Sequence, residues 1–251
     1  SLEAQSNLKR LRILVMLQST ENTIKYIEDG VLEHKTRLGE LYKNIIFPNS
    51  TLAMVALRSR SIGNQDAIFL QLACLVEKPK KIMEIGTWLG TSAYAMAQTS
   101  DALIYTCDEG PDNFYIHEGN ESYANRIIRH PETHSSKFFK KIDGGFDFVF
   151  VDGWLNDDDA EGIFEKCEDN FTFIAHDYYR PEKPKPVFCK GYQAVERMLK
   201  YAWENGYETE LYPPSPDWVN NLGNSYLVNL RMMPHNININ NCCVMIKFER
   251  T

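Results

Sequence analysis

The stretch that decides the fold is Lys81-Ile-Met-Glu-Ile-Gly-Thr-Trp-Leu-Gly-Thr-Ser-Ala-Tyr-Ala-Met-Ala97. It begins with a short apolar run, continues through a turn that holds two glycines, and ends in an alanine-rich segment. This order predicts a buried strand, a tight loop and a helix. Glycines in such a loop let the backbone pass close to a ligand, and a helix N-terminus offers free amide groups to a carboxylate. Ser92 is placed to add a hydroxyl to the same carboxylate.

The spacing of the two glycines limits the ligand that this loop can bind. A dinucleotide fingerprint needs G-x-G-x-x-G, whereas Gly86 and Gly90 stand in a G-x-x-x-G pattern with Glu84 two residues before it. The spacing therefore disfavours NAD. Taken alone, the pattern fits a structural turn as well as a ligand loop, so the rest of the chain has to decide.

Strand-like and helical segments alternate on both sides of this loop. Short apolar runs bounded by Gly, Asp or Asn occupy residues 81–85, 102–107, 146–151 and 171–175. Their composition predicts parallel strands buried on both faces and thus an α/β fold. After Gly191 we expect a helix over 192–205 and strands over 208–212, 225–232 and 242–248.

The N-terminal region has a different pattern. Residues 7–46 carry apolar side chains at helical spacing, interrupted around Ser19-Thr20 and at Gly30, which predicts two or three helices. They are expected to pack on the core or on a second copy of the chain, so a homo-oligomer is one expectation. A further helix is predicted over 64–77. We divide the chain into a helical extension, 1–61, and an α/β domain, 62–251.

Composition narrows the choice of partners. A net charge of −7 disfavours a polyanionic partner, so we expect neither nucleic acid nor a membrane surface. The six cysteines form no C-x-x-C pair and are interpreted as reduced thiols. The longest apolar run near the N-terminus, 13–17, is too short to span a bilayer. A cytoplasmic protein is therefore expected.

Acidic residues follow the second predicted strand. Asp108 and Glu109 stand in the run Thr-Cys-Asp-Glu-Gly-Pro-Asp112, beside the glycine loop. In open α/β sheets ligands bind outside the carboxyl ends of the strands, and an acid there can accept both hydroxyls of a ribose. An isolated acid at this place is commonly a turn or helix cap, but the preceding glycine loop favours the ribose role.

Polar residues also follow the third and fourth predicted strands. Asp152 ends Phe146-Asp-Phe-Val-Phe-Val, and His176-Asp177 end Phe171-Thr-Phe-Ile-Ala. An Asp, His, Asp set can ligate Mg²⁺, and it also admits manganese, iron or zinc. The alternative is that Asp152 caps a turn and that His176 and Asp177 bond to each other. These residues leave the two interpretations equally open.

The four motifs together resemble the catechol O-methyltransferase-like branch of class I S-adenosylmethionine-dependent methyltransferases, over roughly residues 62 to 180. The matching residues are Glu84, Gly86, Gly90 and Ser92 in the cofactor loop, Asp108 as the ribose acid, and Asp152 as the first metal aspartate. His176-Asp177 falls where that family has Asp-Asn and where related macrolide-sugar methyltransferases have Glu-Asp. The resemblance implies a doubly wound, mostly parallel seven-stranded sheet. It implies S-adenosylmethionine and Mg²⁺, or another divalent metal, as cofactors.

The resemblance also assigns further cofactor contacts and shows two departures. Thr87, Trp88, Glu109 and Asp152 are expected to border the cofactor, and Ser135 in His-Ser-Ser136 is the counterpart of the adenine-contacting turn. The family's lysine base, in a Trp-Lys step, is replaced by Trp154-Leu155. A bound metal would then activate the attacking hydroxyl itself, and without a metal His176 becomes the candidate general base, with Asp152 beside it.

Several alternatives stay open at this point. The acceptor is expected to be a small-molecule hydroxyl in a natural product, a sugar or a catechol-like compound, near the aromatic residues Trp88, Trp154, Tyr178 and Tyr179. A metal-dependent hydroxylase or lyase would keep Asp152, His176 and Asp177. A nucleic-acid methyltransferase would need a basic face, and a non-catalytic assembly subunit would bind cofactor weakly.

Overall fold

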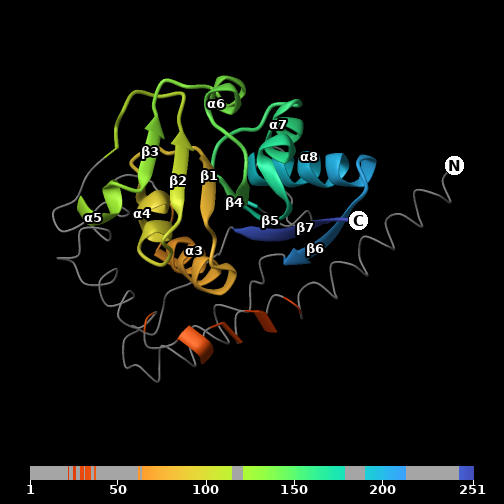
Figure 1. Ribbon diagram of the computed structural model, residues 1–251, viewed down its shortest axis with the longest axis horizontal. Coiled ribbons are helices and arrows are strands. Elements are labelled where there is room, and N and C mark those ends of the chain that lie inside the picture. The colour runs from red at the N-terminus through yellow and green to blue at the C-terminus, as the bar shows by residue number, and fades with distance from the viewer. Residues whose placement is uncertain are drawn as a thin grey trace, which may run out of the picture.

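The computed structural model describes residues 64–114, 121–178, 190–212 and 243–251, together with Ile62 and single positions between Asn22 and Arg37. Within these residues seven strands form one sheet in the order β3-β2-β1-β4-β5-β7-β6. Figure 1 shows this sheet running from β3 at one edge to β6 at the other. The predicted doubly wound, mostly parallel seven-stranded fold is confirmed.

The strands and helices alternate along the chain. The strands are β1 (Lys81–Ile85), β2 (Leu103–Cys107), β3 (Ile127–His130), β4 (Phe146–Val151), β5 (Cys167–Ala175), β6 (Tyr207–Tyr212) and β7 (Val244–Arg250). The helices are α3 (Asn64–Glu77), α4 (Thr91–Ala97), α5 (Glu121–Ala124), α6 (Ser135–Lys141), α7 (Asp159–Lys166) and α8 (Lys190–Glu204). The first five strands pair in parallel, and β7 pairs antiparallel with both β5 and β6.

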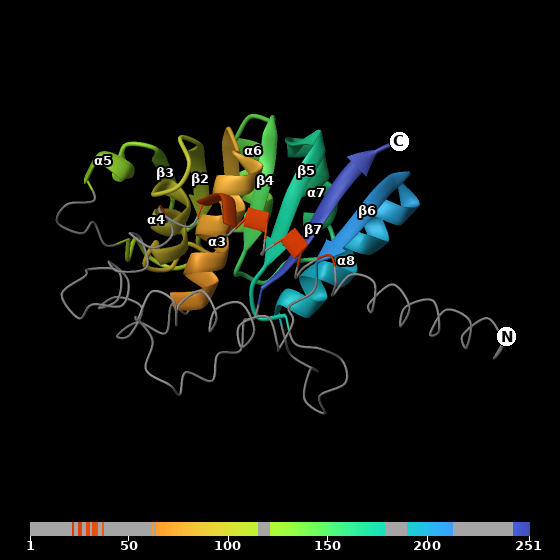
Figure 2. The same ribbon diagram turned by 90° about the horizontal axis from the view of Figure 1, so that it is seen from below.

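Alternate residues of each central strand point to opposite faces of the sheet and fill two cores. Ile82, Phe148 and Phe150 pack with α3 and α4 in one core, whereas Met83 and Val149 pack with α6, α7 and α8 in the other. Figure 2, seen from below, shows these helix layers on the two sides of the sheet. Because both faces are covered, the central strands are apolar throughout, which is the pattern that predicted them.

Several details differ from the sequence expectations, including β7, which spans Val244–Arg250 where a strand was expected over 242–248. Strand β3 was not predicted, because its four residues lie at the edge of the sheet and include the polar Arg129 and His130. Strand β5 begins at Cys167 rather than 171, since its polar first residues still pair with neighbouring strands. Helix α8 begins two residues earlier than expected, at Lys190. The strand expected over 225–232 lies outside the described residues.

The predicted interruption at Gly30 is wrong. Gly30 is helical and buried, and a Cβ at this position would lie 2.9 Å from the side chains of Leu72 and Val76 in α3. The glycine therefore allows a close approach between two helices instead of a break. Nearby, the Tyr26 hydroxyl donates a hydrogen bond to Glu77 Oε1 at 2.7 Å, so this part of the extension packs on the chain's own core.

Other expectations about the extension are not tested. The division at residues 61 and 62 and assembly through the N-terminal helices stay predictions, because most of that region lies outside the described residues. Among the described helices, none combines the length and the apolar composition needed to cross a bilayer.

Candidate active site

The site lies where the strand order reverses. Chain order runs outward from β1 through β2 to β3 on one side and from β4 to β5 on the other. The loops after β1 and β4 therefore diverge at the carboxyl ends of two adjacent strands, which is where open α/β sheets bind ligands. The glycine loop follows β1, and Asp152 follows β4, so the topology brings both predicted motifs to this point.

The loop after β1 needs glycine at two positions. Gly86 has a φ of 102°, and an added Cβ would lie 2.8 Å from the backbone of Asp152. Gly90 has a φ of 80°, and an added Cβ would lie 2.2 Å from the ring of Phe114. Trp88 is also left-handed, with a φ of 44°. The two glycines thus let the loop fold tightly against the end of β4 and against Phe114.

A buried carboxyl group supports this loop from below. Glu84 is fully buried and accepts hydrogen bonds from the hydroxyls of Ser92 and Thr106. Burial raises the pKa of Glu84 to about 8, against the smaller lowering effect of those two hydroxyls. Ser92, predicted to bind a ligand carboxylate, is itself only 4% exposed. Its hydroxyl is therefore committed to joining helix α4 to strand β1.

Asp108 lies beside the loop, as its position after β2 predicted. Its Oδ2 accepts a hydrogen bond from the Trp88 amide at 2.8 Å, and its Oδ1 accepts one from the Gly110 amide at 2.8 Å. These two hydrogen bonds from main-chain amides hold the carboxylate in one orientation, and each oxygen keeps a further lone pair. Asp108 can therefore accept two hydroxyls in a fixed geometry.

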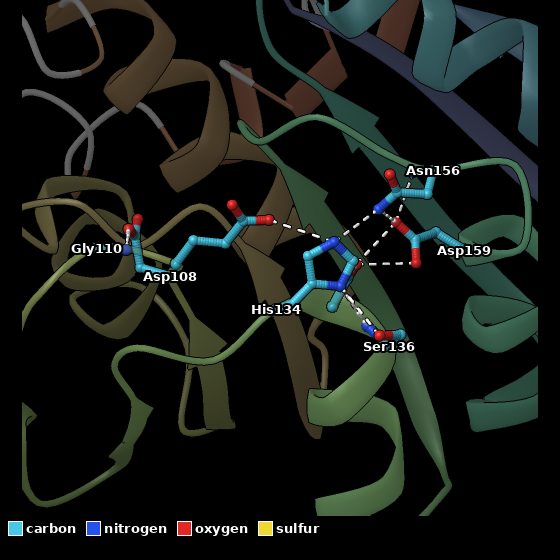
Figure 3. Close-up of polar contacts among 8 residues, drawn as sticks. Asp108, Gly110, His134, Ser136, Asn156 and Asp159 are labelled. Carbon is cyan, nitrogen blue, oxygen red and sulfur yellow. Dashed lines mark hydrogen bonds and ion pairs between the residues drawn. The ribbon is translucent and has the colours of Figure 1, made fainter.

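A histidine links the loops that follow β2, β3 and β4. His134 lies between the segment of Asp108 and Gly110 and that of Asn156 and Asp159 (Figure 3). Its Nε2 is 3.4 Å from Glu109 Oε1 and 3.0 Å from Asn156 Nδ2. Its Nδ1 accepts a hydrogen bond from the Ser136 amide at 3.2 Å. No sequence signal singled out Asn156, which follows β4 in an irregular loop.

The predicted adenine-contacting serine turns its hydroxyl into the protein. Ser135 is 5% exposed, and its Oγ donates to Asp159 Oδ2 at 2.8 Å. Asp159 also accepts a hydrogen bond from the Asn156 amide at 2.6 Å. Ser135 therefore anchors the start of α6 to the start of α7, and any contact with a cofactor would have to come from its backbone.

The three predicted metal-ligating residues do come together. One ligand atom from each of Asp152, His176 and Asp177 lies within 4.8 Å of the other two. His176 Nδ1 is 2.7 Å from Asp152 Oδ1, and its Nε2 is 3.3 Å from Oδ2 of Asp66 in α3. Asp66 was not predicted, because it is 110 residues away in the sequence.

Lys190 is a further member of this cluster that the sequence did not indicate. Its Nζ is 2.6 Å from Asp152 Oδ1 and 3.4 Å from Asp177 Oδ2, and it donates to the Asp152 carbonyl at 2.5 Å. The expected helix began at residue 192, so Lys190 was placed in a loop. A lysine near two strand-end acids can be recognised only when the start of α8 is positioned.

The cluster is strongly charged. Burial lowers the pKa of His176, but hydrogen bonds and charges of Asp152 and Asp66 raise it to about 10. Burial raises the pKa of Asp152, yet His176 and Lys190 bring it below its usual value. Asp152 and Asp177 raise the pKa of Lys190 above its usual value, against the opposing effect of burial. A protonated imidazole cannot accept a proton, so this arrangement does not support His176 as general base.

Aromatic side chains border the same edge of the sheet. Trp88 after β1 is 50% exposed, and Trp154 after β4 is 54% exposed. Tyr178, by contrast, is buried, and its ring stacks on Tyr192 at 5.8 Å between centroids. Tyr179 lies outside the described residues. Among the described aromatic residues at these strand ends, the two tryptophans therefore have exposed rings that a ligand can contact.

Part of the chain resembles a known family. A sequence profile of the family described as O-methyltransferase matches residues 44–160. No curated protein sequence matches the chain significantly.

Solved structures of methyltransferases have a similar fold. An O-methyltransferase from Bacillus cereus in complex with SAH aligns with a TM-score of 0.54 and 16% identity, covering 82% of this chain and 93% of that one. TomG from Streptomyces achromogenes is an O-methyltransferase involved in tomaymycin synthesis, in complex with SAM. It aligns with a TM-score of 0.53 and 15% identity, covering 82% of this chain and 92% of that one. A methyltransferase from Geobacter sulfurreducens aligns with a TM-score of 0.52 and 12% identity, covering 86% of this chain and 96% of that one. The profile match and the fold support the prediction of an S-adenosylmethionine-dependent O-methyltransferase.

Proposed function

We propose that this S-adenosylmethionine-dependent methyltransferase transfers the methyl group to a hydroxyl of a small molecule. The observation that carries the proposal is the meeting of the glycine loop, Asp108 and Asp152 at the switch point between β1 and β4. The O-methyltransferase profile supports oxygen as the atom that receives the methyl group. The net charge of −7 supports a small acceptor over a nucleic acid.

The donor is held on the β1–β2 side in this proposal. Asp108 accepts the two ribose hydroxyls, because its carboxylate is oriented by two amide hydrogen bonds. Glu84 and Ser92 support the loop from the interior rather than touching the ligand. Trp88 and Trp154 offer exposed rings, on which flat groups can stack.

The acceptor hydroxyl lies toward the ends of β4 and β5. Methyl transfer requires the oxygen, the methyl carbon and the sulfur to lie in line, so catalysis depends mainly on positioning. The exposed Trp154 and the polar cluster of Asp152, Asp177 and Lys190 border this region. A natural product, a sugar or a catechol-like compound fits a site with both an aromatic wall and charged groups.

The divalent metal expected from the sequence fits this cluster poorly. Mg²⁺ binds carboxylate oxygens at about 2.1 Å. Asp152 Oδ1 already lies 2.6 Å from Lys190 Nζ and 2.7 Å from His176 Nδ1. A metal on that oxygen would be in contact with the ammonium group, and the two cations would repel each other.

Calorimetric titration tests the proposal directly. We expect S-adenosylmethionine and S-adenosylhomocysteine to bind, and Asp108→Ala to weaken both by about ten- to a hundredfold, equivalent to about 1 to 3 kcal/mol. Asp112→Ala is the matched control, because Asp112 lies in the same loop and pairs with Arg129 instead. Absence of binding at millimolar concentrations would contradict the proposal. Formation of S-adenosylhomocysteine with a panel of phenols, catechols and sugars then identifies the acceptor class.

A cytoplasmic location is part of the same proposal. Cys74, Cys107, Cys167 and Cys243 form no disulfide among the described residues, which fits a reducing compartment. Fractionation of cells that produce the protein tests the location.

A further inference from the structure

A lysine ammonium stands among the residues that were expected to hold a metal. Lys190 Nζ contacts Asp152 at both a carboxylate oxygen and the main-chain carbonyl, and it reaches Asp177 Oδ2 at 3.4 Å. Its side chain is 25% exposed, and that of Asp152 is 19% exposed. The ammonium of Lys190 thus bridges Asp152, which follows β4, and Asp177, which follows β5. A metal ion bound by both acids would occupy the same place.

The backbone around Lys190 fixes this position. The next residue, Gly191, approaches the end of β5 so closely that an added Cβ would lie 1.9 Å from the His176 carbonyl oxygen. Such contact is open only to glycine, and it sets the first turn of α8 directly over His176 and Asp177. The main chain therefore fixes the Cα of Lys190 near the end of β5, from where its side chain reaches Asp152 and Asp177.

His176 has no free nitrogen to offer a metal in this arrangement. Its Nδ1 faces Asp152 and its Nε2 faces Asp66, both across hydrogen bonds to carboxylate oxygens. Each ring nitrogen already has a carboxylate oxygen at hydrogen-bond distance, so a metal ion at either nitrogen would have to compete with that carboxylate. Of the three expected ligands, one is therefore engaged at both ring atoms.

The charge balance points the same way. The Lys190 ammonium lies between the carboxylates of Asp152 and Asp177. A divalent cation placed between these two acids would lie in contact with the ammonium or would have to displace it. Repulsion between two such cations is strong in a partly buried site.

We propose that the ammonium of Lys190 takes the place of the divalent metal in this chain and faces the acceptor oxygen during methyl transfer. The catalytic part of this inference rests on the proposed function. The acceptor oxygen forms a bond to the methyl carbon while the carbon–sulfur bond breaks and leaves its electron pair on sulfur. The hydroxyl proton passes to solvent water, and Lys190 stabilises the negative charge that develops on the oxygen.

Binding of Mn²⁺, followed by electron paramagnetic resonance, tests the inference without an acceptor. We expect the wild-type protein to leave the signal of free Mn²⁺ unchanged at millimolar concentrations. Lys190→Ala removes the internal cation and is expected to bind Mn²⁺ at least roughly tenfold more tightly. Adding Asp177→Asn to Lys190→Ala should abolish the gain, because it removes one carboxylate of the pair.

Two controls keep the test decisive. Lys200→Ala removes an exposed lysine from the same helix and should leave Mn²⁺ binding as in the wild type. Lys190→Met keeps the length of the side chain without its charge, and it should gain Mn²⁺ binding even where the alanine variant unfolds. Tight Mn²⁺ binding by the wild type would overturn the inference, as would a folded Lys190→Met that gains none.

A second measurement separates this inference from the proposed function. S-adenosylhomocysteine binding by calorimetry reports the donor site, and it should persist in Lys190→Met within about threefold. Failure of the wild type to bind S-adenosylhomocysteine would overturn the methyltransferase proposal but not the Mn²⁺ result. Once an acceptor is found, methyl transfer should survive chelation with EDTA and fall at least about tenfold in Lys190→Met. A wild type inactivated by EDTA and restored by Mg²⁺ would refute the replacement of the metal.

Discussion

The donor side and the acceptor side of the site are built in different ways. On the donor side, Trp88 and Asp108 are 20 residues apart in sequence, and Ser92 and Glu84 only 8. On the acceptor side, Lys190 and Asp152 are 38 residues apart, and His176 and Asp66 are 110 apart. A site made from one continuous segment leaves a motif in the sequence, whereas a site made from four elements leaves only scattered polar residues.

The two sides also differ in what holds them together. Around Glu84 the partners are hydroxyl groups, and burial raises the pKa of the carboxyl. Around Asp152 the partners are a lysine and a histidine, and they lower the pKa of the carboxyl against the effect of burial. The donor side should therefore be sensitive to shape and to alkaline pH, and the acceptor side to the loss of a charge.

Removal of Asp152 is expected to have the largest effect. Asp152→Ala leaves His176 and Lys190 partly buried without the carboxylate that both contact. Breaking a buried ion pair in this way costs about 3 to 5 kcal/mol. The free energy of unfolding, measured with urea at neutral pH, should fall by that amount. A loss below about 1 kcal/mol would show that the cluster is solvated and that charge does not dominate the acceptor side.

A methyl group on Gly86 tests the role of shape on the donor side. Gly86→Ala places a Cβ 2.8 Å from the Asp152 backbone at a φ of 102°, and we expect a loss of about 3 kcal/mol. The control is Gly206→Ala, where φ is 74° but no atom lies within 4 Å, so only backbone strain of about 1 kcal/mol remains. The free energy of unfolding is measured with urea for both variants. Equal losses would mean that contact with the Asp152 backbone does not destabilise Gly86→Ala.

Glu84→Gln should change how stability depends on pH. The folded-state pKa of about 8 exceeds the ordinary value of 4.5, so the folded protein binds the extra proton and loses stability as pH rises between those values. The glutamine variant lacks this loss, so it should become progressively more stable than the wild type as pH rises from about 4.5 to 8, with little difference in mild acid. Urea unfolding across this range measures the gap, and parallel curves would contradict a neutral, buried Glu84.

The smallest effect is expected at an exposed pair near the acceptor side. Asp157 contacts Arg197 at 2.9 Å, but its side chain is 91% exposed. Asp157→Ala should change the free energy of unfolding by less than about 0.5 kcal/mol, because solvent screens such pairs. The comparison with Asp152→Ala separates buried charge from surface charge, and a loss above about 1 kcal/mol would erase that distinction.

Much of the fold could be predicted because its strands are buried on both faces. The runs that became β1 and β4 are apolar from end to end and were predicted with the observed bounds. Strand β3 escaped prediction because an edge strand is covered less, so Arg129 and His130 break the apolar pattern. Gly30 was misjudged because a glycine that lets two helices meet has the same sequence signature as one that ends a helix.

By itself the sequence determined the motifs of the donor side: the glycine spacing and the acid after β2, and the family resemblance that these motifs carry predicted a methyltransferase that uses S-adenosylmethionine. These features are local, since each depends on a strand and the turn that follows it. Only the tertiary structure placed Lys190 and Asp66 against the acids that follow β4 and β5. The physical reason is that charges attract across space regardless of their separation along the chain, so their pairing appears only after the sheet and its helices have packed.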